Sequence, residues 1–193
     1  MGETDKIWNI LMVGVGGQGI VLASDLLAQA ALLSGFDAKK SEIHGMSQRG
    51  GSVFSHIRFG KKVYAPVIPE ASCDILVSLE LLETLRWTAY CHPQTKAIVL
   101  TEKILPASAK EYPSGIETEI KRIFADSLFI DPASLIPKIK DKPYLNVALC
   151  GLLANFLPLG PEAWQKALEE CIPPNYYEEN WRAFKEGRLL GCK

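Results

Sequence analysis

The chain has 193 residues, of which 48% are hydrophobic and 22% are charged, and its formal net charge at pH 7 is −1. This composition is typical of a globular protein and excludes collagen, coiled-coil and disordered chains. Without a surplus of basic residues, the chain also lacks the usual electrostatic signature of a nucleic-acid-binding protein. The length predicts one domain, residues 1–193, with the C-terminal helices from about residue 144 packed on the same core.

The amino-terminal segment favours a cytoplasmic protein without a membrane anchor. Acidic residues precede a short apolar run, whereas a secretory signal has a basic start and a longer apolar core. No apolar stretch reaches the roughly 20 residues of a membrane span. The five cysteines are widely separated, so we expect no disulfide framework, no metal site and no iron–sulfur cluster in this chain alone. They are Cys73, Cys91, Cys150, Cys171 and Cys192.

The first elements predict a Rossmann-like βαβ unit. Residues 7–13 are an almost unbroken apolar run, which is typical of a buried strand. Residues 14–19 are a glycine-rich turn, and residues 20–34 form an Ala- and Leu-rich helix that Gly35 ends. Residues 36–43 then predict a second strand.

The following segment predicts a β-hairpin insertion. Residues 52–59 alternate in polarity like a strand, and Gly60 and Lys61 can turn the chain back into a second strand at residues 62–65. Strands and helices alternate beyond this point. The predicted strands are residues 74–79, 96–101 and 128–131, and the predicted helices are residues 80–90, 116–124 and a helix that begins at Pro132.

The C-terminal third is predicted to be helical. Residues 145–157 are apolar nearly all round, which is typical of a core helix. Pro161 begins another helix, and residues 177–190 form an amphipathic last helix whose Trp181 and Phe184 are the first candidates for partner contacts. The whole pattern predicts an α/β fold. It is a three-layer α/β/α sandwich around a Rossmann-like, mostly parallel sheet, with a β-hairpin insertion and a helical C-terminal third.

The glycine turn is the first candidate site. Gly14, Gly16 and Gly19 match G-x-G-x-x-G between a strand and a helix, where main-chain N–H groups can bind a phosphate. We therefore take Gly14, Gly16, Gly17, Gln18 and Gly19 as candidate cofactor-binding residues. A dinucleotide would also need an acidic residue about 20 positions further on, for which Glu42 is only a loose match. Glycines that serve packing, or a site for another anion or an interface, are the alternatives.

The second candidate site is the loop His44-Gly45-Met46-Ser47-Gln48-Arg49-Gly50-Gly51. It follows the second predicted strand, at the same sheet edge as the glycine turn, where α/β proteins bind ligands. Arg49 can bind a carboxylate or a phosphate through two hydrogen bonds, or can form an ordinary ion pair. His44 and Arg49 are the weak catalytic candidates, and a structural role for His44 is the alternative. Ser47, Gln48, Arg49 and Gly50 complete the candidate cofactor-binding residues.

The two loops together resemble a known family. The stretches GVGGQGIVLASDLLAQAA and EIHGMSQRGGSVFSHIRFG are similar to the gamma-type domain of 2-oxoacid:ferredoxin oxidoreductases and, more narrowly, to beta subunits of the indolepyruvate type. Later stretches agree over about residues 7–190. They are ASCDILVSLELLETLR with Asp74, Glu80 and Glu83, then NVALCGL, and then NWRAFKEG.

This resemblance implies one subunit of a larger enzyme. Such enzymes oxidatively decarboxylate a 2-oxoacid, transfer the acyl group to the co-substrate coenzyme A and pass two electrons to ferredoxin. Thiamine diphosphate and 4Fe-4S clusters belong to a larger alpha-type partner subunit, so this chain would hold no cofactor alone. It would be inactive alone and would complete the active site and the subunit interface.

Three interpretations of function remain open from the sequence. The first is the oxidoreductase subunit, for aryl-pyruvate substrates. The second is a stand-alone nucleotide- or coenzyme-binding module on a Rossmann-like fold, and the third is a non-catalytic assembly subunit. A homodimer of the isolated chain is a further expectation, and we expect neither nucleic acid nor a membrane among the partners.

Overall fold

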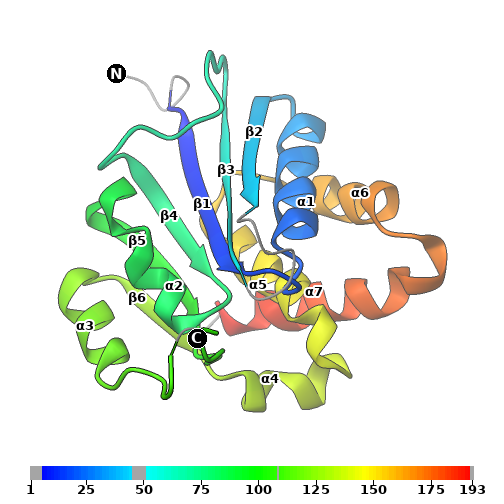
Figure 1. The fold of residues 1–193 in the computed structure, drawn as a ribbon. Coiled ribbons are helices and arrows are strands. Elements are labelled where there is room, and N and C mark those ends of the chain that lie inside the picture. The colour runs from blue at the N-terminus through cyan, green and yellow to red at the C-terminus, as the bar shows by residue number, and fades with distance from the viewer. Residues whose placement is uncertain (1–5, 45–50, 108, 192–193) are drawn as a thin grey trace.

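In a computed structural model of the protein, residues 6–44, 51–107 and 109–191 are described, apart from the side chain of His44. Their strands form one sheet in the order β2-β3-β1-β4-β5-β6 (Figure 1). The strands are β1 (Trp8–Val15), β2 (Asp37–His44), β3 (Ser52–Gly60), β4 (Cys73–Ser78), β5 (Cys91–Leu100) and β6 (Ser127–Ile130). The α-helices are α1 (Ile20–Leu33), α2 (Leu81–Arg86), α3 (Ile116–Ile123), α4 (Pro132–Ile139), α5 (Leu145–Leu153), α6 (Pro161–Cys171) and α7 (Tyr177–Leu190).

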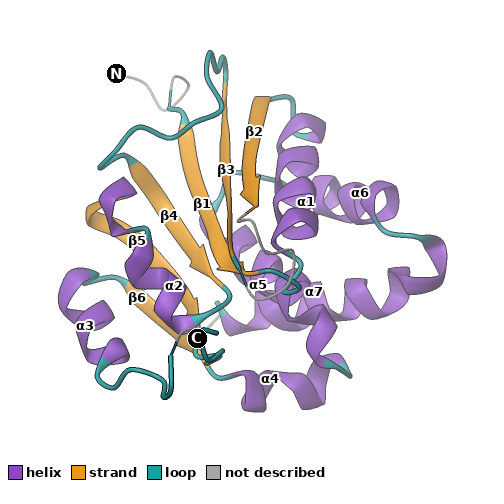
Figure 2. Cartoon of the chain, viewed as in Figure 1, coloured by secondary structure: helices purple, strands orange, loops and turns teal. Residues whose placement is uncertain are grey.

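Helices cover both faces of the sheet, so the predicted three-layer sandwich is confirmed (Figure 2). Side chains of the central strand β1 alternate between two hydrophobic clusters, as the twofold repeat of a strand requires. Ile10 and Met12 pack with residues of α1, α4, α5, α6 and α7, whereas Leu11 and Val13 pack with residues of α2 and α3. Within the described residues, no helix has the length and apolarity needed to span a bilayer.

The sheet is mixed, and β3 runs opposite to the other strands of the described chain. β3 pairs antiparallel with both β1 and β2, whereas β1, β4, β5 and β6 pair in parallel. The βαβ unit β1-α1-β2 is therefore present, but β3 lies between its two strands. The predicted mostly parallel sheet is confirmed in this form.

The predicted hairpin strand at residues 62–65 is wrong. Residues 62–65 form no strand, because β1 and β2 already occupy both edges of β3 and leave no edge for a further strand. The Asp37 carboxylate instead accepts a hydrogen bond from the Val63 N–H at 2.8 Å, which ties this segment to the start of β2.

β5 begins earlier than the sequence predicts, and the helix before it is shorter. α2 ends at Arg86, and β5 begins at Cys91 instead of residue 96. His92 and Pro93, which follow the predicted helix at residues 80–90, lie in an irregular part of the β4–β5 pairing. Between the pairs Cys73–Cys91 and Ile75–Lys96, β5 has more residues than β4. Pro93 lies in this stretch, so its missing N–H removes no hydrogen bond of the regular strand pairing.

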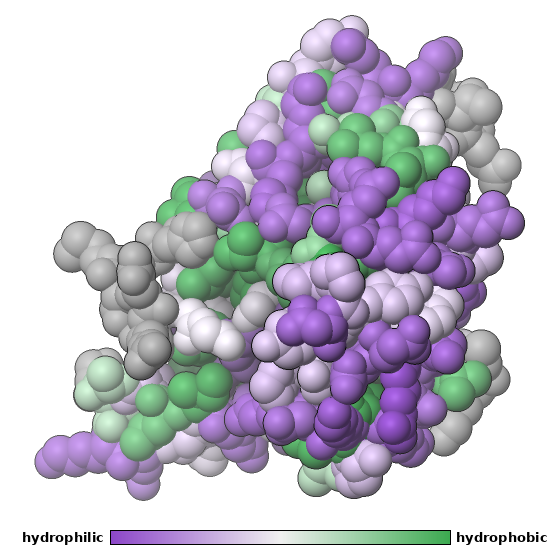
Figure 3. All heavy atoms as spheres, turned by 90° about the vertical axis from the view of Figure 1, so that its right-hand side faces the viewer, coloured by the Kyte–Doolittle hydropathy of each residue, from purple (hydrophilic) through white to green (hydrophobic). Residues whose placement is uncertain are grey.

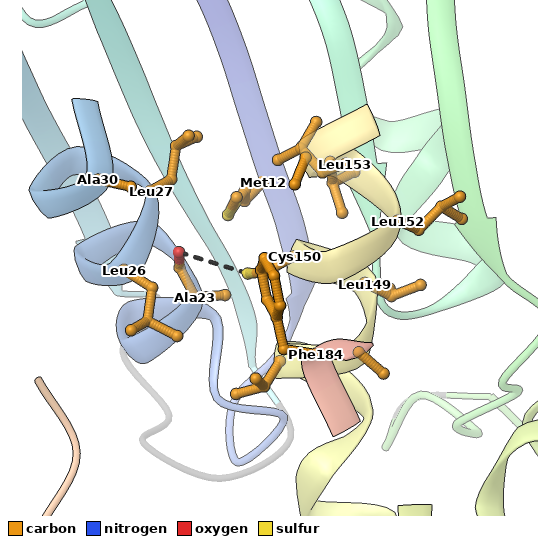
Figure 4. Packing of buried hydrophobic residues seen from close by; sticks show 14 of the residues in the cluster. Met12, Ala23, Leu26, Leu27, Ala30, Leu149, Cys150, Leu152, Leu153 and Phe184 are labelled. Carbon is orange, nitrogen blue, oxygen red and sulfur yellow. Dashed lines mark hydrogen bonds between the residues drawn. The ribbon is translucent and has the colours of Figure 1, made fainter. Parts of the chain in front are cut away.

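The core under the sheet centres on α5, whose nine residues are all buried. Cys150 on α5 faces α1 and donates to the Ala23 carbonyl at 3.7 Å (Figure 4). Phe184 of α7 is fully buried, with its ring 5.3 Å from that of Trp164. The expectation that Phe184 contacts a partner is therefore wrong, because its side chain fills the chain's own core. Trp181 stacks on Phe184 at 5.6 Å and is partly buried.

The contact between α5 and α7 generates the first prediction. A Cβ atom on Gly187 would lie 1.8 Å from the Ala148 carbonyl oxygen. This oxygen belongs to the main chain of α5, so it cannot move away as easily as the end of a flexible side chain. We expect Gly187→Ala to lower the free energy of unfolding by more than about 3 kcal/mol, at the upper end of overpacking costs. Chemical denaturation followed by circular dichroism measures this loss.

Gly160→Ala is the matched control, because a Cβ at Gly160 meets no atom within 4 Å. We expect it to change the same free energy by less than about 1 kcal/mol. If the two variants lost the same free energy of unfolding, the close contact of Gly187 with Ala148 would not contribute to stability.

Candidate functional site

Two loops meet at the carboxyl end of β1. Val15, the last residue of β1, pairs with Ser52, the first residue of β3, and the Gly16 N–H donates to the Gly51 carbonyl at 2.8 Å. His44, the last residue of β2, pairs with Val53. The glycine turn and both ends of the predicted second loop therefore share one sheet edge, as the sequence predicted.

The Gln18 side chain fixes the glycine turn from within. Its Oε1 atom accepts from the Val15 N–H at 2.8 Å, and its Nε2 atom donates to the Leu79 carbonyl at 2.6 Å. The Gln18 N–H also donates to the Val15 carbonyl at 3.1 Å, which closes the turn. Gln18 thus joins the ends of β1 and β4, and its contact with a ligand stays a prediction.

The turn glycines differ in what surrounds them. A Cβ on Gly14 would lie 2.8 Å from Gln18 Oε1, and one on Gly19 would lie 2.3 Å from Asn146 Nδ2. These two positions therefore serve packing. Gly17 has a φ of +100°, and a Cβ there would meet no atom within 4 Å. Gly17 thus has open space beside it, unlike Gly14 and Gly19.

Asn146 also lines the cavity beside the turn, although the sequence pattern predicts no role for it there. It is buried on α5, and its Nδ2 atom donates to the Gly19 carbonyl at 3.0 Å. Its Oδ1 atom accepts from the Val147 N–H at 2.9 Å. The available signal was one amide in an otherwise apolar core helix, because a buried polar group needs a partner.

A cavity of about 380 Å³ opens beside the turn and the first turn of α1. This volume lies at the lower end of ligand pockets, which span about 300–1,000 Å³. Apolar side chains form much of its wall, and Lys142 adds a charge that pairs with Glu102 at 2.6 Å. The lining residues are Gly17, Gln18, Gly19, Leu22, Leu79, Leu100, Lys142, Pro143, Leu145 and Asn146.

The first turn of α1 lies beside this cavity, and no described side chain caps its main-chain N–H groups. Its N-cap is Gly19, which has no side chain to accept from the first N–H groups, and no acidic residue lies in the first turn. The positive end of the helix dipole therefore has no acidic residue in its own first turn to neutralise it. Such an arrangement favours a phosphate or carboxylate.

A buried carboxylate, that of Glu80, organises the adjoining end of β4. Its Oε2 atom accepts from the Glu83 N–H at 2.9 Å and so caps α2. Its Oε1 atom accepts from the Ile104 N–H at 3.1 Å and from the Tyr112 hydroxyl at 2.7 Å. Burial and this hydrogen bond to Glu80 raise the pKa of Tyr112, so the phenol remains a donor.

Glu83 connects α2 to the start of β3. Its Oε2 atom accepts from the Ser52 hydroxyl at 2.5 Å and from the Trp87 indole N–H at 3.3 Å. Its Oε1 atom pairs with Arg86 Nε at 2.9 Å. Because Ser52 directly follows the glycine pair of the second loop, Glu83 fixes the point at which that loop re-enters the sheet.

Several predicted site residues lie outside the described residues. These are Ser47, Gln48, Arg49 and Gly50, together with the side chain of His44. Glu42, the loose candidate for a ribose contact, pairs instead with Lys40 at 3.1 Å.

The described residues offer no ligand set for a metal centre. Within residues 6–44, 51–107 and 109–191, no three His, Cys, Asp or Glu side chains gather in an arrangement that could hold a metal ion. Cys150, for example, is enclosed by the apolar core and faces α1. The described side chains therefore do not fit an iron–sulfur cluster, which needs clustered thiolates.

Comparison with known proteins places these features in a family. Residues 9–190 match the family described as pyruvate ferredoxin/flavodoxin oxidoreductase. The chain is 34% identical over 187 residues to indolepyruvate oxidoreductase subunit IorB of Archaeoglobus fulgidus, and the match covers 93% of this chain and 92% of that protein.

Solved structures share the fold. The gamma subunit of a keto/oxoacid ferredoxin oxidoreductase from Geobacter sulfurreducens has a TM-score of 0.72 and 21% identity, with 97% of both chains covered. A 2-oxoglutarate:ferredoxin oxidoreductase from Magnetococcus marinus, with 2-oxoglutarate, coenzyme A and succinyl-CoA bound, has a TM-score of 0.76 and 16% identity. The match covers 97% of this chain but 31% of that one.

The Glu80 network generates the second prediction. In Glu80→Gln, an NH2 group replaces one of the two carboxylate oxygens. This NH2 group cannot accept a hydrogen bond from a main-chain N–H, so at least one of the three hydrogen bonds to Glu80 is lost. We expect the free energy of unfolding to fall by about 1–3 kcal/mol. Denaturant titration measures it, and Glu111→Gln, at an exposed position, is the control that we expect to change nothing. Identical midpoints for the two variants would contradict the assignment of Glu80.

Proposed function

The chain belongs to the pyruvate ferredoxin/flavodoxin oxidoreductase family, and we propose that it is the small subunit of an indolepyruvate-type 2-oxoacid:ferredoxin oxidoreductase. In this proposal the assembled cytoplasmic enzyme decarboxylates an aryl-pyruvate oxidatively, forms the acyl-CoA and passes the electrons to ferredoxin. The near full-length similarity to indolepyruvate oxidoreductase subunits carries the choice of substrate type.

The proposed role of this chain is to complete the active site and the subunit interface. Thiamine diphosphate and 4Fe-4S clusters, held by the larger subunit, would supply the decarboxylation and electron-transfer chemistry. Within the described residues, no three His, Cys, Asp or Glu side chains lie together so that they could hold a metal ion. This supports the assignment of the clusters to the partner. The chain alone would then be inactive.

The cavity beside the glycine turn is the proposed contact with the reactants. The main-chain N–H groups at the start of α1, which no described side chain caps, would bind an anionic group, either a coenzyme A phosphate or the carboxylate of the oxoacid. Leu22, Leu79 and Leu100 would enclose an adjoining apolar group and exclude water from it. Arg49 would add a second contact to the anion.

Assembly of the complex is the direct test. The chain and the larger subunit are produced separately without oxygen, and coenzyme A-dependent reduction of ferredoxin by indolepyruvate is measured for each alone and for the mixture. We expect turnover in the mixture alone. A chain that forms no complex with the larger subunit, or a larger subunit fully active without it, would contradict the proposal.

Gly17→Ala generates the third prediction, for the assembled enzyme. The methyl group enters the open space beside the turn, where it would obstruct a bound anion. We expect the KM for coenzyme A or for the oxoacid to rise at least about tenfold, which corresponds to about 1.4 kcal/mol of lost binding.

Gly35→Ala is the matched control. Gly35 has a φ of +84°, and a Cβ there also meets no atom within 4 Å, but it follows the opposite end of α1. Both variants should lose a similar stability of about 1–2 kcal/mol through backbone strain. If the two assembled enzymes had the same kinetic constants, the turn would not be a ligand site.

Arg49→Ala generates the fourth prediction. We expect weaker binding of coenzyme A or the oxoacid in the assembled enzyme, because a guanidinium that binds an anion is removed. Arg122→Ala, whose exposed side chain pairs with Glu119 on α3, should leave the kinetics unchanged. Unchanged turnover and coenzyme A affinity in Arg49→Ala would remove Arg49 from the proposed site.

A further inference from the structure

Two cysteines lie side by side at the amino ends of neighbouring strands. Cys73 is the first residue of β4, Cys91 is the first residue of β5, and their Cα atoms are partners in the parallel ladder. Adjacent parallel strands lie about 4.8 Å apart, which is within the range of Cα separations that a disulfide spans. Paired residues of a ladder also project their side chains to the same face of the sheet.

Main-chain hydrogen bonds hold the two segments together beside the pair. The Ala71 N–H donates to the Ala89 carbonyl at 3.0 Å, and the Ser72 N–H donates to the Tyr90 carbonyl at 2.9 Å. The Thr95 hydroxyl donates to the Cys73 carbonyl at 2.6 Å from the other side of the irregular β5 segment. The positions of the two cysteines are therefore fixed before any bond joins them.

The two thiols differ in access and acidity, and both are free. Cys73 is fully buried, and burial raises its pKa well above the ordinary value. Cys91 is half-buried, and a hydrogen bond with the Cys73 thiol lowers its pKa. Cys91 is thus the more exposed of the two residues, and its thiol ionises more readily, which is the profile of an attacking cysteine. Cys73 beside it has the position of a resolving cysteine.

The other described cysteines have no such arrangement. Cys150 lies in the apolar core, where burial raises its pKa to about 12. Cys171 at the end of α6 is half-buried, and burial raises its pKa as well. Among the described cysteines, Cys73 and Cys91 alone are paired in the sheet.

We propose that Cys73 and Cys91 form a reversible disulfide when the protein meets hydrogen peroxide. The Cys91 sulfur attacks one peroxide oxygen, the O–O bond breaks, and a sulfenic acid and one water result. The Cys73 sulfur then attacks the Cys91 sulfur, the S–O bond breaks, and the hydroxyl leaves as a second water with the Cys73 proton. Two thiols are oxidised by two electrons in total, and one peroxide is reduced to two waters.

The bond would close a loop that contains α2. Residues 73–91 include Glu80 and Glu83, whose carboxylates organise the opposite, carboxyl end of the sheet. Oxidation would therefore connect the two strands on either side of these groups and restrict separation of β4 from β5. The disulfide would also keep Cys91 from irreversible oxidation to the sulfinic acid.

Peptide mapping of the full chain tests the proposal. The protein is purified without oxygen, treated with one equivalent of hydrogen peroxide, alkylated, and digested with trypsin without reduction. Cleavage after Lys62, Arg86 and Lys96 places Cys73 in residues 63–86 and Cys91 in residues 87–96. We expect these two peptides as one cross-linked species, two hydrogen atoms lighter than their sum, that dithiothreitol separates.

Variants identify the order of the steps. Cys73→Ser should leave a sulfenic acid on Cys91 that dimedone labels, whereas Cys91→Ser should leave Cys73 unmodified. Cys171→Ser is the matched control and should keep the cross-link. Separate alkylated peptides from the treated unaltered chain, or a cross-link between Cys91 and a different cysteine, would overturn the proposal. The mapping of the unaltered chain decides the matter even if a variant fails to fold.

Discussion

Two side-chain amides, those of Gln18 and Asn146, hold the turn on which the candidate site depends. Gln18 joins the end of β1 to the end of β4, and Asn146 joins the turn to α5. Both residues are bonded to main chain, so they position the start of α1 without depending on other flexible side chains. The cavity lies beside the turn, and α1, α5 and the carboxyl end of β5 contribute to its wall.

Buried carboxylates organise the other half of the same sheet edge. Glu80 and Glu83 would be costly to bury alone, but within the described residues their carboxylate oxygens accept hydrogen bonds from main-chain N–H groups and from side chains. Through Ser52 they fix the strand that leaves the second loop, and through Ile104 they fix the segment after β5. The edge is thus built around polar groups with satisfied hydrogen bonds, which favours one defined geometry.

Hydrophilic side chains cover much of the face in Figure 3, and the hydrophobic side chains form separate patches between them. Exposed apolar residues lie on several elements, for example Leu33 on α1, Tyr64 after β3 and Leu189 on α7. Phe184, a candidate for partner contact, is part of the chain's own core.

The sequence by itself determined the elements whose patterns are local. The bounds of α7 at residues 177–190 follow its amphipathic repeat, Pro132 and Pro161 begin helices as predicted, and Gly35 ends α1. The glycine turn was located by its spacing and its place between a strand and a helix. These features depend on residues close in the chain, which is why they can be read from it.

Tertiary structure alone decided which strands are neighbours and which glycines pack. β3 has both edges occupied, which prevents a strand at residues 62–65, and pairing with Cys73 begins β5 at Cys91 despite Pro93. Gly19 faces Asn146 across 127 positions of the chain, so no local pattern could show that contact. Such pairings depend on how the whole sheet is buried. The partner of a strand or of a buried amide is the group that the folded core places next to it.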